Sequence, residues 1–247
     1  MGRYDGKRAV ITGGTSGIGL ATAKLLLEHG ARVLVTGRTR ATLDAVSAEL
    51  GEGAVVVESD AASLAAIEAL ADRVKSEFGA IDLLYINAGV TRFAPFESVT
   101  EELYDEVLEI NAKGPYFTVQ KLAPLISEGG AVVVTTSVAN ELGYPMISAY
   151  SASKAALRSM VRSLARELLP RRIRVNAVSP GPIESGILEK TLPPEAVDQT
   201  KQTMSAENPM QRFGRPEEVA RAVAFLAFEA TYTTGEELAV DGGGSQL

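Results

Sequence analysis

Cysteine and tryptophan are absent from the 247-residue chain, and histidine occurs once, as His29. Without cysteine there is no disulfide, no thiolate nucleophile, no iron–sulfur cluster and no cysteine-ligated zinc. A single histidine also excludes a cluster of histidine metal ligands. Any catalysis must therefore use hydroxyl, amide, amine or carboxylate side chains, or a bound organic cofactor.

Long apolar runs and an excess of positive charge are missing as well. The longest apolar run, 222–228, is far shorter than the roughly 20 residues of a membrane span, and the first residues contain no apolar segment like that of a signal peptide. Lys and Arg number 24 against 31 Asp and Glu, a net charge of −7, which disfavours nucleic acid as the main ligand. We expect a cytoplasmic protein that binds neither a membrane nor nucleic acid.

The chain does contain a regular alternation of short β-branched runs and longer amphipathic stretches. Strands are predicted at 8–12, 32–36, 54–58, 81–86, 131–136, 174–178 and 237–240, and helices at 18–29, 40–50, 63–78, 101–126, 149–169 and 216–228. This alternation indicates right-handed βαβ crossovers and a parallel sheet with helices on both faces. We expect one doubly wound, Rossmann-type α/β domain over 1–247, with an irregular insertion at 180–215 that binds substrate.

The first predicted strand leads directly into a glycine-rich turn, Thr12–Gly19. Glycine lets the backbone approach a pyrophosphate, and the N-terminus of the following helix offers free N–H groups and a positive dipole. The turn lacks the Gly-Lys-Ser/Thr ending of an ATP-binding loop. A tight turn without a ligand is the alternative, but its place at the first strand–helix turn favours a dinucleotide. The candidate contacts are Gly13, Thr15, Ser16, Gly17, Ile18 and Gly19.

Residues at the end of the second predicted strand determine whether the site prefers NAD or NADP. An acidic residue there would bind the 2′-hydroxyl of NAD, but the sequence has Arg38 and Thr39. Arg38 offers a planar, permanently charged fork that suits a 2′-phosphate. The sequence therefore predicts NADP(H) as the cofactor, in contact with both residues. The alternative is that Arg38 is only a solvated residue at a helix start.

Tyr150 and Lys154 are four residues apart at the start of a predicted helix, so their side chains share one face. A free tyrosine has a pKa of about 10 and is therefore protonated, and inactive as a base, at neutral pH. A nearby ammonium stabilises the phenolate and lowers that pKa. The pair therefore predicts a general acid–base site, although the spacing alone leaves a structural role open.

Several motifs occur in a fixed order along nearly the whole chain. They are the glycine-rich turn, Asp60, Asn87-Ala88-Gly89, Asn111, Ser137, Tyr150-x3-Lys154, Pro180-Gly181 and Val240-Asp241-Gly242-Gly243. In this set and order the chain resembles the short-chain dehydrogenase/reductase family. The resemblance implies a strand order of 3-2-1-4-5-6-7, a nicotinamide cofactor, and the interconversion of carbonyl and alcohol groups.

The resemblance also implies catalytic roles. Tyr150 would protonate the carbonyl oxygen during reduction, and Ser137 would donate a hydrogen bond to the same oxygen. Lys154 would hydrogen-bond the nicotinamide ribose and lower the pKa of Tyr150, while Asn111 would anchor a water that links Lys154 to solvent. Because the cofactor carries the hydride, this chemistry calls for no metal.

Further cofactor contacts follow from the same resemblance. They are Asp60 and Ala61 at the adenine, Asn87, Ala88 and Gly89 at the adenosine ribose, and Pro180, Gly181, Ile183 and Ser185 at the nicotinamide. Relatives that prefer NADP often have a basic residue at the position of Ser16. Its absence leaves Arg38 as the main expected contact for the 2′-phosphate.

Other conspicuous residues have plainer interpretations. His29 is expected to end the first helix, where a partial positive charge suits the helix dipole. The acidic run 101–109 indicates a solvated helix face rather than a metal site. Met204, Met210 and Phe213 either line a substrate pocket or seal the core, and the sequence leaves both open.

The predicted function is NADP(H)-dependent interconversion of a small to medium ketone or aldehyde and the corresponding alcohol. One alternative is a 3-oxoacyl-[acyl-carrier-protein] reductase, although 122–137 has no Lys or Arg to dock an acidic carrier protein. The alternative of another class is an inactive NADP(H)-sensing protein, which the retained Ser137, Tyr150 and Lys154 disfavour. By analogy with relatives, the helices beginning at 101 and 149 would form the interfaces of a homotetramer, with a homodimer as the alternative.

Overall fold

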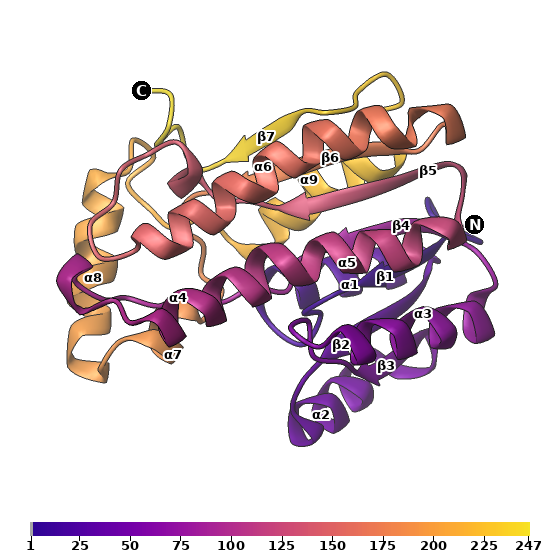
Figure 1. Ribbon diagram of the computed structural model, residues 1–247, viewed down its shortest axis with the longest axis horizontal. Coiled ribbons are helices and arrows are strands. Elements are labelled where there is room, and N and C mark those ends of the chain that lie inside the picture. The colour runs from indigo at the N-terminus through magenta and orange to yellow at the C-terminus, as the bar shows by residue number, and fades with distance from the viewer. Residues whose placement is uncertain (1) are drawn as a thin grey trace.

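Seven parallel strands form the central sheet of the computed structural model, which describes residues 2–247 (Figure 1). The strands are β1 (Arg8–Ile11), β2 (Arg32–Gly37), β3 (Ala54–Glu58), β4 (Ile81–Ile86), β5 (Ile126–Thr135), β6 (Arg174–Pro180) and β7 (Glu237–Val240). Their order is β3-β2-β1-β4-β5-β6-β7, and every neighbouring pair is parallel. The predicted α/β fold and strand order are thereby confirmed.

Helices cover both faces of this sheet. They are α1 (Gly17–Glu28), α2 (Arg40–Leu50), α3 (Leu64–Phe78), α4 (Glu101–Leu108), α5 (Gly114–Leu122), α6 (Ser148–Leu168), α7 (Ile187–Thr191), α8 (Pro194–Glu207) and α9 (Pro216–Phe228). Successive strand residues point to opposite faces, so Ile11 joins the apolar core under α1 and α9, whereas Val10 joins the core under α3, α5 and α6. Both side chains are fully buried, and the burial of each stabilises the fold by about 1.5–3 kcal/mol.

The prediction of one helix over 101–126 is wrong. A π-helical turn at Glu109–Lys113 separates α4 from α5, and β5 already begins at Ile126. Pro115 lacks the N–H that would continue the α4 hydrogen-bond pattern, and it lies in the first turn of α5, where that loss is tolerated. The wider turn places Asn111 in the interior, with none of its surface exposed.

The stretch 180–215, which was predicted to be irregular, contains α7 and α8. Pro194 begins α8 at a position that favours proline. The two helices enclose a small apolar cluster of their own, with Leu188, Val197 and Phe213 buried in it. Because this cluster is separate from the two main cores, the segment lacks the long apolar stripe that identifies the other helices in the sequence.

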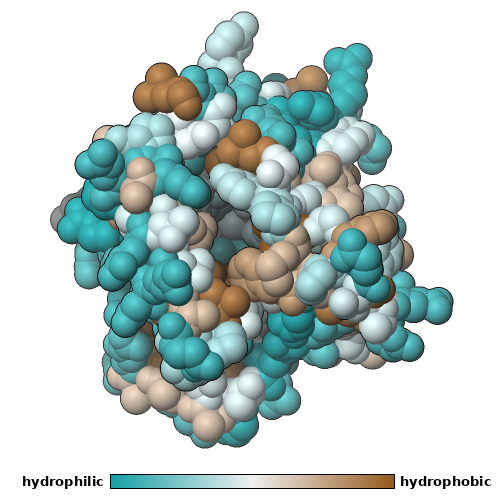
Figure 2. Space-filling model, turned by 90° about the vertical axis from the view of Figure 1, so that its left-hand side faces the viewer, coloured by the Kyte–Doolittle hydropathy of each residue, from teal (hydrophilic) through white to brown (hydrophobic). Residues whose placement is uncertain are grey.

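The carboxyl ends of parallel strands meet at one edge of the sheet, where open α/β sheets bind their ligands. In Figure 1 this edge lies on the left, beside α7 and α8. Figure 2 views the molecule from that side and shows a hollow in the middle of the face, with apolar side chains around it and hydrophilic ones farther out. No helix within residues 2–247 has the length and apolar character needed to cross a membrane.

Candidate active site

The turn between β1 and α1 forms a cradle that is kept free of side chains. Gly13 and Gly17 have φ angles of +64° and +52°, which glycine adopts without strain. A Cβ atom on Gly13 would lie 2.8 Å from the Ala88 Cα, and one on Gly17 would lie 2.9 Å from the Ser185 Cβ. A Cβ atom on Gly19 would collide with the Gly13 carbonyl oxygen. Glycine at these three positions therefore lets the turn pack closely against Ala88, Ser185 and its own backbone.

The N-terminus of α1 offers free hydrogen-bond donors at the cradle. Ser16 is the N-cap residue, but its side chain makes no capping hydrogen bond. The N–H groups of Gly17, Ile18 and Gly19 have no acceptor within residues 2–247. Unpaired N–H groups at the positive end of a helix bind phosphate. The cradle and its donors therefore fit the diphosphate of a dinucleotide.

The segment after β4 braces the cradle from the side. Thr12 Oγ1 accepts hydrogen bonds from the N–H groups of Asn87 at 3.0 Å and Ala88 at 3.1 Å. Asn87 Nδ2 donates to the Gly13 carbonyl oxygen at 3.0 Å. The Asn87 side chain thus joins β4 to the glycine-rich turn. The backbone of Ala88 and Gly89 is left to line the site.

The residues expected around the adenosine lie beyond the cradle, at the ends of β2 and β3. Arg38–Thr39 follows β2 and is exposed. Gly37, which precedes it, packs so closely on Thr15 that a Cβ atom there would lie 2.6 Å from the Thr15 Cγ2. Asp60 and Ala61 follow β3, the strand that pairs with β2. The fold therefore brings these predicted contacts to one end of the cradle.

Tyr150 lies in the first turn of α6, with two hydroxyl groups around its phenol. Burial raises the pKa of Tyr150 above its ordinary value and outweighs the hydrogen bonds with Ser137 and Thr91, which lower it. The net shift is therefore upward, opposite to the lowering that the spacing of Tyr150 and Lys154 predicts. Burial dominates because a phenolate loses more solvation in the interior than a neutral phenol does. Tyr150 remains a neutral proton donor at neutral pH.

Lys154 is buried beside Tyr150, with 4% of its surface exposed. Its Nζ lies 5.6 Å from the centre of the Tyr150 ring, so the two side chains share a helix face as predicted. Nζ donates a hydrogen bond to the Thr135 carbonyl oxygen at 2.8 Å. Burial lowers the pKa of Lys154 to about 8. The ammonium is therefore mostly charged at neutral pH and loses its proton in the mildly alkaline range.

Asn111, in the π-helical turn, holds the segment after β4. Its Oδ1 accepts from the Val90 N–H at 2.8 Å, and its Nδ2 donates to the Val90 carbonyl oxygen at 2.8 Å and to Ser153 Oγ at 3.1 Å. π-Helical turns are frequent at functional sites. The side chain thus acts as a clamp that joins this segment to α6. The water-anchoring role implied by the family resemblance stays a prediction.

Thr91 is a site residue that the sequence did not reveal. It is 7% exposed, and its hydroxyl reaches Tyr150. Arg92, the next residue, forms a two-pronged ion pair with Glu106 of α4, with Nε and Oε2 2.9 Å apart. Clamping on both sides therefore fixes Thr91. The signal that could have found it is its place just past the carboxyl end of β4.

Ser137 is supported from behind by a carboxylate on β7. Glu237 accepts hydrogen bonds from Thr136 Oγ1 and, at 2.8 Å, from Asn140 Nδ2, and these two residues flank Ser137. Glu237 also pairs with Arg158 at 3.3 Å, with both side chains largely buried. This network holds the backbone that carries the Ser137 hydroxyl.

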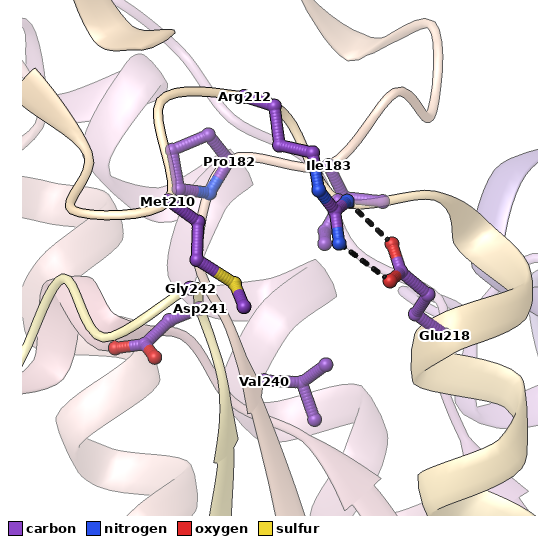
Figure 3. Close-up of a pocket in the computed structure, with 9 residues that line it drawn as sticks. Pro182, Ile183, Met210, Arg212, Glu218, Val240, Asp241 and Gly242 are labelled. Carbon is purple, nitrogen blue, oxygen red and sulfur yellow. Dashed lines mark hydrogen bonds and ion pairs between the residues drawn. The ribbon is translucent and has the colours of Figure 1, made fainter. Parts of the chain in front are cut away.

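The segment Pro180–Ser185 runs from the end of β6 toward the cradle. Gly181 N–H donates to the Val240 carbonyl oxygen at 3.1 Å. Next to this segment Figure 3 shows a cavity of about 50 Å³, lined by Pro182, Ile183, Met210, Arg212, Gly214, Glu218, Val240, Asp241 and Gly242. Such a cavity has room for one or two water molecules, and none of the four expected catalytic residues, Asn111, Ser137, Tyr150 and Lys154, lines it. The cavity therefore lies behind the segment Pro180–Ser185 and apart from the catalytic residues.

Met204, Met210 and Phe213, which the sequence assigned to either a substrate pocket or the core, lie in two different environments. Met204 and Phe213 pack in the apolar cluster of α7 and α8, together with Phe93 from the segment after β4. Met210 is largely exposed and lines the small cavity. Within residues 2–247 no group of three or more His, Asp or Glu side chains is arranged to hold a metal ion. The four residues expected to be catalytic supply two hydroxyl groups, one amine and one amide.

Known proteins are similar to this chain in both sequence and fold. The family model described as enoyl-(acyl carrier protein) reductase matches residues 13–245. A short-chain dehydrogenase/reductase crystal structure from Brucella melitensis superposes with a TM-score of 0.91 at 32% identity, covering 98% of each chain. The chain belongs to the short-chain dehydrogenase/reductase family. Proteins of this family are oxidoreductases that bind a nicotinamide cofactor, NAD or NADP.

Relatives in the family carry several different names. The oxidoreductase asL5 of Sarocladium schorii is 40% identical over 248 residues, covering 99% of this chain and 98% of its own. A 3-oxoacyl-[acyl-carrier-protein] reductase of Thermotoga maritima is 38% identical over 252 residues, covering 98% of each. A 3alpha-hydroxysteroid dehydrogenase of Mediterraneibacter gnavus is 37% identical, covering 96% of each. The family is shared by these relatives, whereas the named substrates differ.

Proposed function

We propose that this short-chain dehydrogenase/reductase interconverts a ketone or aldehyde and an alcohol with NADP(H). The observation that carries the proposal is the Tyr150 phenol within hydrogen-bond reach of Ser137 and beside the buried Lys154. Arg38 supports NADP(H), because it offers a cation at the end of β2 where a carboxylate would repel a 2′-phosphate.

The raised pKa of Tyr150 suits the reduction direction. A neutral phenol donates its Oη proton to the carbonyl oxygen while Ser137 Oγ donates a hydrogen bond to the same atom. A reduced nicotinamide, when bound, would supply the hydride to the carbonyl carbon. With the proton from Tyr150, this hydride would convert the carbonyl into an alcohol. Lys154 adds a positive charge that favours the tyrosinate left behind.

Replacement of the proton donor tests this proposal. Tyr150→Phe should lower kcat for ketone reduction by about 100-fold or more, while NADPH binding measured by calorimetry stays within about twofold of the wild type. Tyr144→Phe is the matched control, because Tyr144 is a second tyrosine at this edge that is more exposed. Unchanged turnover by Tyr150→Phe would remove Tyr150 from the mechanism. No turnover by the wild type across a panel of ketones and alcohols, with NADPH still bound, would favour the inactive sensor.

A 3-oxoacyl-[acyl-carrier-protein] reductase is the second candidate, favoured by the relative of that name. The cations near α8 give it limited support, because Lys201 is paired with Glu189 and Arg212 with Glu218. A carrier-bound 3-oxoacyl group should then be reduced with a much lower KM than the same acyl group on coenzyme A. Equal KM values would exclude recognition of the carrier protein.

We also infer a homotetramer, because large apolar side chains are exposed on two separate parts of the chain. Tyr104 and Tyr116 are exposed on α4 and α5, and Phe225 and Tyr232 on and just after α9. Two self-complementary surfaces generate a closed tetramer, whereas one generates a dimer. Light scattering on the purified protein distinguishes the two assemblies. The cytoplasmic location stays a prediction from the sequence.

A further inference from the structure

Lys190 on α7 reaches the glycine cradle from a segment 174 residues away in sequence. Its Nζ donates a hydrogen bond to Ser16 Oγ at 3.2 Å. At the base of the same segment, Ser185 packs on Gly17, where it leaves no room for a Cβ atom. The N-terminus of α1 is therefore touched twice by the 180–215 segment, once by backbone packing and once by an ammonium group.

The Lys190 ammonium is available for an anion. No ion pair among residues 2–247 includes Lys190, and the neighbouring carboxylate of Glu189 is taken up by Lys201 at 2.6 Å. Both Lys190 and Ser16 are exposed, so the hydrogen bond between them is easily exchanged. A phosphate oxygen offers Lys190 a stronger, charge-assisted hydrogen bond than the neutral hydroxyl does.

A second observation at the same place points to an anion. The N–H groups of Gly17, Ile18 and Gly19 are unpaired beside Ser16, and they belong to a helix of 12 residues with its positive end at this turn. The residue before Arg38, Gly37, packs on Thr15. Among residues 2–247, Lys190 is the only cationic side chain that hydrogen-bonds to the Thr15–Ser16 turn.

We propose that Lys190 is a phosphate-binding residue of the dinucleotide site. The proposal rests on the proposed function, since it assigns a further contact to the same cofactor. Ser16 itself carries no charge, and Lys190 supplies one at this position. Because Lys190 belongs to the segment that carries α7 and α8, a phosphate bound by Lys190 also contacts that segment. The two phosphate sources are the diphosphate, which NADH and NADPH share, and the 2′-phosphate, which only NADPH has.

Isothermal titration calorimetry with NADPH and with NADH tests the assignment without measuring activity. The variants are Lys190→Met, which keeps the chain length and removes the charge, and Lys190→Arg, which restores a cation. Lys201→Met is the matched control, because it removes a lysine of the same segment that is paired with Glu189 and not with Ser16. We expect Lys190→Met to weaken NADPH binding about five- to tenfold, while Lys190→Arg and Lys201→Met stay within about twofold of the wild type.

The two ligands separate the two sources. A loss confined to NADPH assigns Lys190 to the 2′-phosphate, and an equal loss for both nucleotides assigns it to the diphosphate. Wild-type affinity of Lys190→Met for both nucleotides overturns the proposal, and so does an equal loss in Lys201→Met. Failure of the wild type to bind either nucleotide is a different result, because it removes the proposed cofactor itself and the inference with it.

Discussion

Replacement of Lys154 by Met should stabilise the protein at neutral pH while it abolishes turnover. Burial lowers the pKa of Lys154 from 10.5 to about 8, and each pKa unit corresponds to about 1.4 kcal/mol. The buried ammonium therefore costs the folded chain about 3 kcal/mol at pH 7. The hydrogen bond to the Thr135 carbonyl oxygen returns about 1 kcal/mol. Met has a similar length and no charge, so a net gain of about 1–2 kcal/mol is expected.

The pH dependence of this gain identifies its cause. Between about pH 8 and 10.5 the unfolded chain keeps the Lys154 proton that the folded chain has lost, so the stability of the wild type rises with pH in this window. The advantage of Lys154→Met is therefore complete below about pH 8 and shrinks above it. Urea unfolding of both proteins at pH 7 and pH 9.5 measures the difference, with the partly exposed Lys201→Met as the control. A variant that is less stable at pH 7, or a gain that does not change with pH, would refute the reasoning.

Two further replacements test the residues that support the site. Thr91→Val removes the hydroxyl whose hydrogen bond lowers the pKa of Tyr150, an interaction of about 1.5–3 kcal/mol. The pKa of Tyr150 should therefore rise in the variant. Alcohol oxidation on the acid side of its pH profile should slow about tenfold or more, and that side should move to higher pH. Thr91→Ser should restore the wild-type profile, and an unmoved profile in Thr91→Val would show that the hydroxyl does not act on Tyr150. Glu237→Gln leaves Arg158 largely buried without its charge partner and should lower the free energy of unfolding by about 3 kcal/mol. A urea-unfolding loss below about 1 kcal/mol would contradict the assigned support role.

Local sequence patterns predict the parts of the molecule that depend on neighbours in the chain. The β-branched runs become strands, and those in the middle of the sheet bury both faces, as Val10 and Ile11 do. The glycine-rich turn forms a cradle because its backbone has a positive φ at position 13, which glycine adopts without strain. His29 caps the end of α1 as expected. In these cases the cause lies within a few residues of its effect.

The features that the sequence did not give depend on contacts between distant segments. Asn111 clamps Val90, which lies 21 positions earlier, and Lys190 reaches Ser16 across the whole chain. Tyr150 shows the same limit for electrostatics, because the spacing predicts a neighbouring ammonium but not the burial that raises the pKa of Tyr150. Burial is a property of the packed interior, and no local pattern encodes it.

The segment after β4 contacts several parts of the site that lie far apart in the sequence. Asn87 ties it to the glycine cradle, Asn111 clamps its middle to α6, and Thr91 brings a hydroxyl to Tyr150. Two residues further on, Phe93 packs in the apolar cluster of α7 and α8. The backbone stretch 87–93 therefore contacts the glycine cradle, Tyr150 and the apolar cluster of α7 and α8. Packing of Phe93 in that cluster helps to fix the backbone that carries Thr91 two residues earlier.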